Sequence, residues 1–105
     1  MAKLPSSFRE TNRTTEQFRA LFATLPVHVQ ELVRGAAKLF NDSPAHPSLR
    51  HHELEDTKKG KHVAGSFSVS ITMQYRAIYV PGADGMNVWY WIGTHSDYDT
   101  FTGGK

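Results

Sequence analysis

Apolar positions recur with a helical period in the first part of the chain. Four of them stand at i, i+3, i+4 and i+7: Phe18, Leu21, Phe22 and Leu25. This spacing predicts one face of a short amphipathic helix. Thr14-Thr15-Glu16-Gln17 matches a capping box, in which the threonine hydroxyl accepts from the amide three residues on and the glutamine reaches back. The helix is therefore expected to begin there.

A second helix is predicted from Pro26 to about Phe40. Proline is disfavoured inside a helix but suits a first turn, and apolar residues keep the helical period after it. Asn41-Asp42-Ser43-Pro44 then supplies turn residues, so the two helices form an αα-hairpin. Gly35 costs about 1 kcal/mol relative to alanine. Because alanines follow it at positions 36 and 37, we expect Gly35 to pack closely against another element.

From residue 65 the period changes to two. Apolar and hydroxyl residues alternate there: Phe67, Val69, Ile71 and Met73 with Ser66, Ser68, Ser70 and Thr72. This pattern predicts a strand with one buried face and a Ser/Thr face open to solvent or to a ligand. Tyr75 to Val80 and Asn87 to Ile92 are two further predicted strands, joined by a hairpin connection at 81–85. The last has no polar alternation, so we expect it to be central or covered on both faces.

Weaker patterns predict short strands at Phe8 to Thr11 and near Arg50 to Leu54, and a final turn capped by Ser96 that runs through Phe101. The fold class that follows is α+β. An N-terminal helical hairpin packs on one face of a small, mainly antiparallel sheet.

The chain has 105 residues and 11.8 kDa, which is enough for one domain and one core. We expect a single domain over 1–105, with 1–7 and 102–105 loose. The absence of cysteine excludes disulfides and thiolate chemistry. No apolar run approaches a membrane span, and the first residues lack a signal peptide, so we expect a cytoplasmic protein without a membrane partner. The net charge of +2 permits a nucleic-acid partner without requiring one.

The sequence contains no phosphate loop, zinc helix, nucleophile elbow or dinucleotide fingerprint. Four residues have the types that ligate metals: His46, His51, His52 and Glu53. They lack a regular i, i+4 frame, so we expect neither a metal nor a cofactor.

Individual polar residues are then the candidates for chemistry. Arg76 interrupts an apolar strand and must find a carboxylate, a phosphate or solvent, although a structural ion pair explains it as well. His95 follows the last strand, where an imidazole could move a proton, and Tyr98 could stack on a base or pack as a lid on the core. Lys58, Lys59, Lys61 and His62 form a basic loop that either follows a phosphate backbone or is simply solvated.

Taken together, the segments resemble a known family. They are the helical hairpin Phe18 to Phe40, Ser43 to Arg50, Gly65 to Ile71, Tyr75 to Tyr79 and Trp91 to Tyr98. In their order and spacing they look like toxins of the RelE/ParE superfamily, from bacterial type II toxin–antitoxin modules. The resemblance implies a twisted antiparallel sheet with two N-terminal helices and an antitoxin protein as partner.

The superfamily has two activities. RelE-like members cleave messenger RNA in the ribosomal A site, whereas ParE-like members bind DNA gyrase. Arg76 matches the arginine of the family's Tyr-Arg strand motif and would clamp a phosphate. His95 falls where several nucleases carry a histidine and would be the acid or base, and Tyr98 resembles a nearby aromatic residue that stacks on a base or orients the phosphate.

The chain also departs from the family pattern. Ser68 and Ser70 stand where some RelE-like members carry lysines, and no glutamate matches the base of other members. The general base is therefore not assigned. It is either His62, or His95 acts without a second proton-transfer residue. The expectation is a RelE-like, ribosome-dependent endoribonuclease that inhibits translation and has mRNA, the ribosome and an antitoxin as partners. The alternatives are a gyrase-binding toxin and a degenerate antitoxin-binding scaffold.

Overall fold

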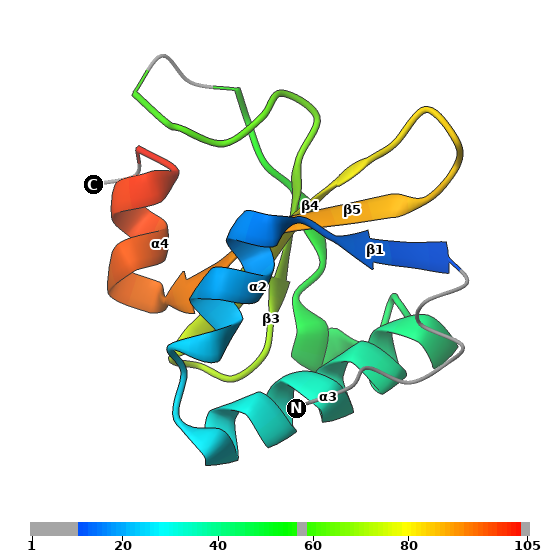
Figure 1. The fold of residues 1–105 in the computed structure, drawn as a ribbon. Helices are drawn as coiled ribbons and strands as arrows, with labels where there is room; N and C mark the ends of the chain where they lie inside the picture. The colour runs from blue at the N-terminus through cyan, green and yellow to red at the C-terminus, as the bar shows by residue number, and fades with distance from the viewer. Residues whose placement is uncertain (1–10, 57–58, 104–105) are drawn as a thin grey trace.

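A computed structural model describes residues 11–56 and 59–103. Within these residues one five-stranded sheet has the order β1-β5-β4-β3-β2, and Figure 1 shows its arrangement. Strand β1 runs parallel to β5, and the other neighbours are antiparallel. The strands are β1 (Asn12–Thr14), β2 (His52–Glu53), β3 (Phe67–Ser70), β4 (Tyr75–Pro81) and β5 (Asn87–Thr94). The helices are α2 (Glu16–Ala23), α3 (Val27–Asp42), the 3₁₀ turn η1 (Pro47–Leu49) and α4 (His95–Phe101).

The predicted helical hairpin is present as α2 and α3, with a different cap. Thr15 and not Thr14 caps α2, because its side chain accepts from the amide of Phe18 at 3.1 Å. Gln17 does not reach back to the cap. Its amide donates to the carbonyl of Tyr90 at 2.9 Å and so ties α2 to β5.

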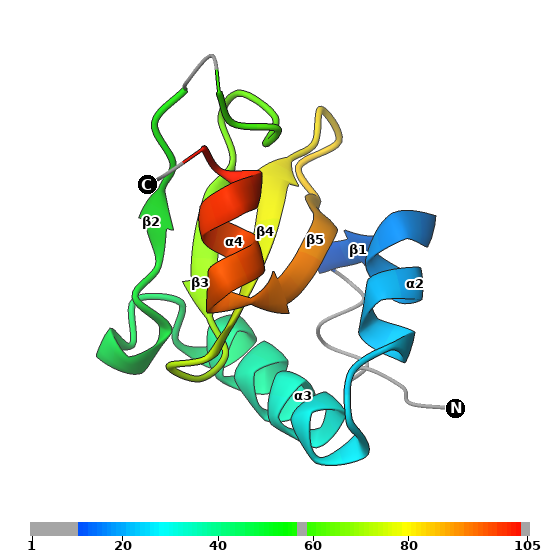
Figure 2. The same cartoon turned by 90° about the vertical axis from the view of Figure 1, so that its left-hand side faces the viewer.

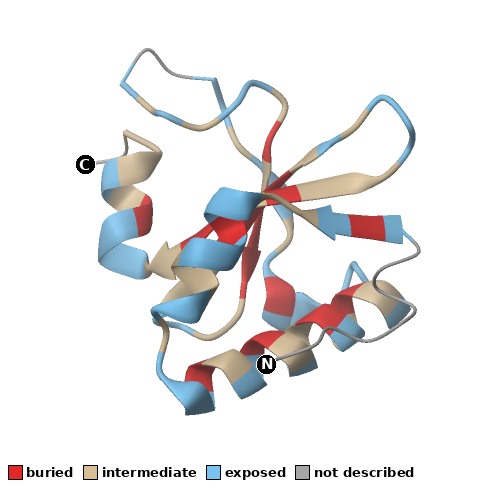
Figure 3. Ribbon diagram, viewed as in Figure 1, coloured by how far each residue is buried: buried red, intermediate tan, exposed pale blue. Residues whose placement is uncertain are grey.

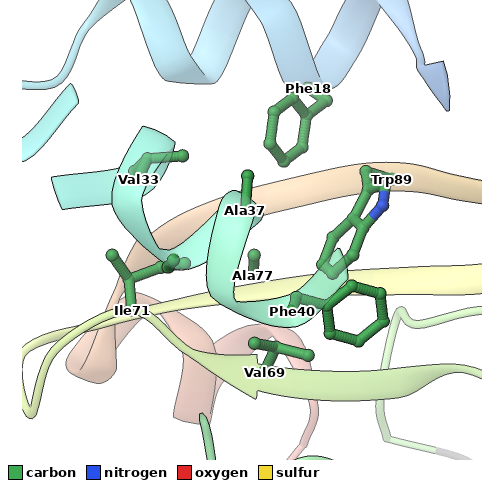
Figure 4. Close-up of a pocket in the computed structure, with 9 residues that line it drawn as sticks. Phe18, Val33, Ala37, Phe40, Val69, Ile71, Ala77 and Trp89 are labelled. Atoms are coloured by element: carbon green, nitrogen blue, oxygen red, sulfur yellow. The ribbon is translucent and has the colours of Figure 1, made fainter. Parts of the chain in front are cut away.

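The main core lies between α3 and one face of the sheet. Helix α3 contributes Val29, Val33, Ala37 and Phe40, and the strands contribute Val69, Ala77, Tyr79, Trp89 and Ile92. Figure 4 shows part of this layer, where the side chains enclose a small apolar cavity of about 20 Å³. A cavity of this size holds at most about one water. Of the apolar face predicted for the strand at 66–73, Val69 is buried and Phe67 and Ile71 are partly buried against the core, whereas Met73 is exposed.

Helix α4 covers the opposite face of the sheet. Tyr98 packs there against Ile78 and Trp91, and Figure 2 shows α4 lying across β4 and β5 on the side away from α3. The expectation of an open Ser/Thr face is therefore wrong: Ser66, Ser68 and Ser70 are all buried. The sequence pattern suggested only a final turn, whereas α4 is a two-turn helix that packs on β4 and β5 on this side of the sheet.

The uninterrupted aromatic and apolar run of β5 has two causes. Strand β5 lies between β1 and β4, which confirms the central position expected for it. Its register with β4 shifts between Ile78 and Tyr79, which pair with Trp91 and Trp89, so Tyr90 is an extra residue. The bulge turns Tyr90 and Trp91 toward α4, while Trp89 faces α3. Neighbouring residues consequently face the same side, and alternation is lost.

Three further expectations are corrected. The strand predicted to reach Met73 ends at Ser70, because the amides of Ile71 and Thr72 both donate to the carbonyl of Tyr75 in a tight turn. The last helix begins at His95, where Thr94 and not Ser96 is the cap. Gly35 does not pack against another element, since a Cβ placed on it would meet nothing within 4 Å. It lies on the outer side of α3, which Figure 3 shows to be largely exposed.

The edge strands also differ from expectation. The predicted strand near Arg50 to Leu54 is present as the two residues of β2. The strand predicted at Phe8 to Thr11 falls almost entirely outside the described residues, and β1 begins just after it, at Asn12. The segments 1–7 and 104–105 also lie outside the described residues, whereas Thr102 and Gly103 are hydrogen bonded to the last turn of α4.

The α+β class, with the helical hairpin and a mainly antiparallel sheet, is confirmed. No helix among residues 11–56 and 59–103 is both long and apolar enough to cross a membrane.

Candidate active site around Arg76 and His95

Arg76 lies near the start of β4 and points toward α4. In the sheet it pairs with Ser70 on β3 and with Gly93 on β5. Because side chains alternate along a strand, Arg76 shares its face with Ile78, which packs under α4, and not with Ala77, which faces α3. Strand β4 thus places the guanidinium of Arg76 beside the N-terminal end of α4.

Three contacts define the position of the guanidinium. Its Nε donates to Nδ1 of His95 at 3.0 Å, and one terminal nitrogen donates to the Ser70 hydroxyl at 3.0 Å. Its Cζ lies 5.1 Å from the centre of the Tyr98 ring. The three residues predicted to act together are therefore brought into contact, and no ion pair with a carboxylate is found for Arg76 among the described residues.

His95 is the first residue of α4, and its backbone is held from two sides. Its amide donates to the carbonyl of Gln74 at 2.7 Å, and the preceding Thr94 caps the helix by accepting from the Asp97 amide at 3.1 Å. The imidazole remains accessible, with 48% of its side chain exposed. Its Nε2 lies 3.4 Å from a carboxylate oxygen of Asp99. The ring therefore has an arginine at one nitrogen and an aspartate at the other.

A solvent-open groove of about 320 Å³ adjoins His95. It lies between the β3–β4 turn and the start of α4. Its lining residues are Met73, Gln74, Tyr75, Thr94, His95 and Ser96. An exposed thioether, a phenol ring and an amide beside an imidazole give this groove both apolar surface and hydrogen-bonding groups.

Tyr98 is 8% exposed, and its ring packs near Trp91, with centroids 6.2 Å apart. Little of the ring is available to a stacked base. The contact that it does make is with the face of the Arg76 guanidinium, in a geometry that is favourable for a cation over an aromatic ring. The arrangement fits the predicted role of orienting a phosphate, exercised through Arg76.

The basic loop lies at the other end of α4. Lys58 falls outside the described residues, and Lys59 and Lys61 are exposed. The amide of Lys61 donates to the carbonyl of Phe101 at 2.7 Å, which anchors the loop to the last turn of the helix. His62 is bonded through Nε2 to the carbonyl of Glu55 at 2.8 Å, and its Nδ1 is buried. Between the two candidate bases, His95 has the exposed ring beside Arg76.

Two members of this cluster were missed by sequence analysis. Asp99 meets His95 only because α4 begins at His95, which places them one turn apart at i and i+4. Ser70 was noted only as a departure from the family's lysines, yet its hydroxyl accepts from Arg76. A His-x-x-x-Asp spacing in the sequence indicates this contact if the helix begins at His95. The predicted cap at Ser96 placed the start of the helix after His95, so the contact was not expected.

The residues with metal-binding side chains do not form a metal centre. His46 caps η1 by accepting from the amide of Ser48, His52 bonds to the carbonyl of Arg50, and His51 lies 2.7 Å from the Tyr79 hydroxyl. No group of three or more His, Asp or Glu side chains suited to a metal ion is found in the described part of the chain.

His51 and Tyr79 instead form a hydrogen-bonded pair beside the core. The ring of Phe40 packs edge-on against both, with centroids 5.3 and 5.6 Å away. Burial lowers the pKa of His51 and raises the pKa of Tyr79 to about 12, because charging either ring there loses water. The pair is thus held neutral.

Comparison with solved structures identifies the fold. The chain is similar to YafQ from Escherichia coli strain BL21(DE3), with a TM-score of 0.63 at 13% identity over 82% of this chain and 93% of that one. It is also similar to the toxin–antitoxin complex RelBE2 of Mycobacterium tuberculosis, with a TM-score of 0.52 at 22% identity over 81% and 96% of the two chains.

A third similar structure is the RelB–RelE antitoxin–toxin complex of Methanococcus jannaschii, with a TM-score of 0.54 at 13% identity over 84% of this chain and 96% of that chain. No protein-family model and no curated sequence matches the chain. The chain therefore has the RelE-like fold that the sequence motifs indicated, and it spans nearly the whole length of each of these structures.

Proposed function

We propose that this protein is the toxin of a toxin–antitoxin pair and that it acts as a RelE-like endoribonuclease on mRNA in the ribosome. Two of the similar structures are described as toxin–antitoxin complexes, which supports an antitoxin protein as partner. The observation that carries the nuclease proposal is the direct contact of Arg76 with His95, at 3.0 Å on an accessible surface.

This pair suits the cleavage of RNA without a metal. The ribose 2′-oxygen attacks the adjacent phosphorus, the bond from phosphorus to the 5′-oxygen breaks, and a cyclic phosphate and a 5′-hydroxyl result. A base must take the 2′-proton, an acid must protonate the 5′-oxygen, and a cation must stabilise the charge on the phosphate. Arg76 is the clamp for the phosphate, and His95 is the proton-transfer group.

The remaining candidates take supporting roles. Tyr98 packs its ring against the face of the guanidinium, and the Ser70 hydroxyl accepts a hydrogen bond from one of its terminal nitrogens. The exposed Lys59 and Lys61, with Lys58 beside them in the sequence, contact the phosphate backbone of mRNA or of ribosomal RNA, which makes binding weaker as salt rises. His62, predicted to join them, has one ring nitrogen bonded to the Glu55 carbonyl and the other buried, so it takes no part in this contact. No cofactor enters this scheme.

Inducible expression in bacteria tests the proposal. Wild type is expected to stop growth and to produce cut messages, and both effects are lost in Arg76→Ala and in His95→Ala. Arg34→Ala and His28→Ala are the matched controls, because both residues lie on α3, away from the cluster, and both variants should remain toxic. Co-expression of the cognate antitoxin should restore growth.

Other outcomes contradict the nuclease. A DNA-damage response with intact messages would indicate a gyrase-binding toxin, and the absence of any growth effect would indicate an inactive scaffold. Toxicity that persists in both Arg76→Ala and His95→Ala would remove these residues from the mechanism.

A further inference from the structure

The contact with Arg76 decides which nitrogen of His95 carries the proton. Arginine Nε is always a donor, so the Nδ1 that it reaches at 3.0 Å must be the acceptor. The neutral ring then has its proton on Nε2, which is the nitrogen that lies 3.4 Å from the Asp99 carboxylate. Nδ1, the acceptor, thus faces a donor, and the protonated Nε2 faces a carboxylate.

The same geometry selects the atom that exchanges a proton with substrate. A phosphate held by Arg76 brings its ribose oxygens next to Nδ1, because the guanidinium and Nδ1 are in contact. Nε2 lies on the other side of the ring and faces α4. When the phosphate, a charged acceptor, takes the Nε–H of Arg76, the lone pair of Nδ1 becomes free for the 2′-hydroxyl.

We infer that Asp99 is a positioning residue for this proton transfer, holding His95 in the Nε2–H form and stabilising the imidazolium that appears once Nδ1 has taken the 2′-proton. The inference rests on the proposed nuclease function. In the step itself, the O–H bond of the ribose breaks, its electron pair forms the bond to phosphorus, and the proton resides on Nδ1 until it passes to the departing 5′-oxygen.

The other groups around the ring make the carboxylate necessary. Arg76 on β4 is a fixed positive charge and opposes a second one on His95. Tyr98 on α4 is neutral, with its ring centre 6.3 Å away, and Tyr75 lines the adjoining groove. Asp99 is the negative charge found in contact with His95 among the described residues. It therefore offsets the effect of Arg76 when the ring becomes charged.

The first test is independent of nuclease activity. Long-range ¹H–¹⁵N NMR spectra of the His95 ring at mildly alkaline pH should show a bare Nδ1 and a protonated Nε2 in wild type. In Asp99→Asn the Nε2–H loses its charged acceptor, so its resonance should move upfield and broaden through faster exchange with water. Asp97→Asn is the matched control, since it removes the same charge from the same helix and should leave the Nε2–H resonance as it is in wild type.

The second test measures ribosome-dependent cleavage. Asp99→Asn should reduce the rate by roughly two- to fivefold at neutral pH, while Asp99→Glu restores most of the rate. A neutral ring protonated on Nδ1, or an Nε2–H resonance that is the same in Asp99→Asn and in wild type, overturns the inference. If the NMR results are as expected but no variant, wild type included, cuts RNA, the nuclease proposal fails and so does the catalytic role assigned to Asp99.

Discussion

The guanidinium of Arg76 lies over the face of the Tyr98 ring, with Cζ 5.1 Å from the ring centre. Tyr98 is itself wedged between this cation and Trp91 on the sheet. The proposed phosphate clamp is therefore held by this ring together with hydrogen bonds to His95 and Ser70, and not by a carboxylate. A clamp held in this way keeps its full charge for a ligand.

Substitutions of Tyr98 separate the ring from its hydroxyl. Tyr98→Phe keeps the cation–aromatic contact and should retain cleavage close to wild type. Tyr98→Leu loses the contact and should lower cleavage by roughly fivefold, corresponding to about 1 kcal/mol for a partly exposed cation over a ring. The measurement is cleavage of a message on purified ribosomes, with far-UV circular dichroism to check folding. Equal losses of cleavage in both variants would assign the role to the Tyr98 hydroxyl and contradict the role of the ring as a support for Arg76.

Gly35→Ala should stabilise the protein. The residue lies within α3, its Cβ would meet nothing, and its φ is not positive. Alanine removes the entropic cost of glycine in a helix, so the free energy of unfolding should rise by about 0.5–1 kcal/mol, as measured by urea denaturation. Gly103→Ala is the opposite control, because φ is +72° there and the new Cβ would lie 2.6 Å from the Gly60 nitrogen. A loss of stability in Gly35→Ala would show that the glycine has a structural role.

The buried serines predict two different responses to the same substitution. Ser68 is fully buried, and its hydroxyl has no hydrogen-bond partner among the described residues. Ser68→Ala should therefore be neutral or stabilising by a few tenths of a kcal/mol, because an unpaired polar group is removed from the interior.

Ser66 is the matched control. Its hydroxyl donates to the Val63 carbonyl and lies 2.6 Å from the Tyr90 hydroxyl, which in turn accepts from the Val63 amide. Ser66→Ala opens this closed ring of hydrogen bonds and should cost about 1–2 kcal/mol. Thermal denaturation of both variants measures the difference, and equal costs would mean that Ser68 is also bonded.

The His51–Tyr79 pair predicts how stability depends on pH. Burial lowers the pKa of His51, so between that lowered value and the ordinary 6.5 the unfolded chain binds more protons than the folded one. This contribution to stability is present above about pH 6.5 and is lost as the pH falls below it. The Tyr79 pKa is raised to about 12, and its contribution is lost as the pH rises from about 10 toward 12.

Urea denaturation from pH 5 to pH 8 measures the first effect. His51→Gln should flatten the rise of stability with pH, whereas His28→Gln, at an exposed position on α3, should leave the slope as it is in wild type. An unchanged slope in His51→Gln would locate the titrating group elsewhere.

Much of the fold could be predicted from the sequence because the periodic spacing of apolar residues is a local pattern. The apolar stripe of α2 and α3 and the alternation before Ser70 each report one buried face, and both were predicted correctly. The second layer was not predicted. Helix α4 is two turns long and starts directly after the last residue of β5, so its effect on the opposite face depends on packing between Tyr98 and Trp91, which no local pattern contains.

The site was accessible in part for the same reason. Arg76 and His95 each stand out as polar residues next to apolar strands, and the antiparallel pairing of β4 with β5 brings them together. Asp99 depends on the first residue of a helix, which is the feature that sequence patterns locate least well. A shift of one residue in that start would turn its carboxylate away from the imidazole.

Strand β1 pairs with a strand that lies more than 70 residues further along the chain, and Asn12 accepts from the indole of Trp89 at 2.8 Å. During synthesis the first strand has no neighbour in the sheet until β5 has left the ribosome, and α4 with its imidazole emerges later still. Contacts of such long separation form late in folding. The contacts among Arg76, His95 and Tyr98 therefore cannot form until α4, which ends at Phe101, has been translated.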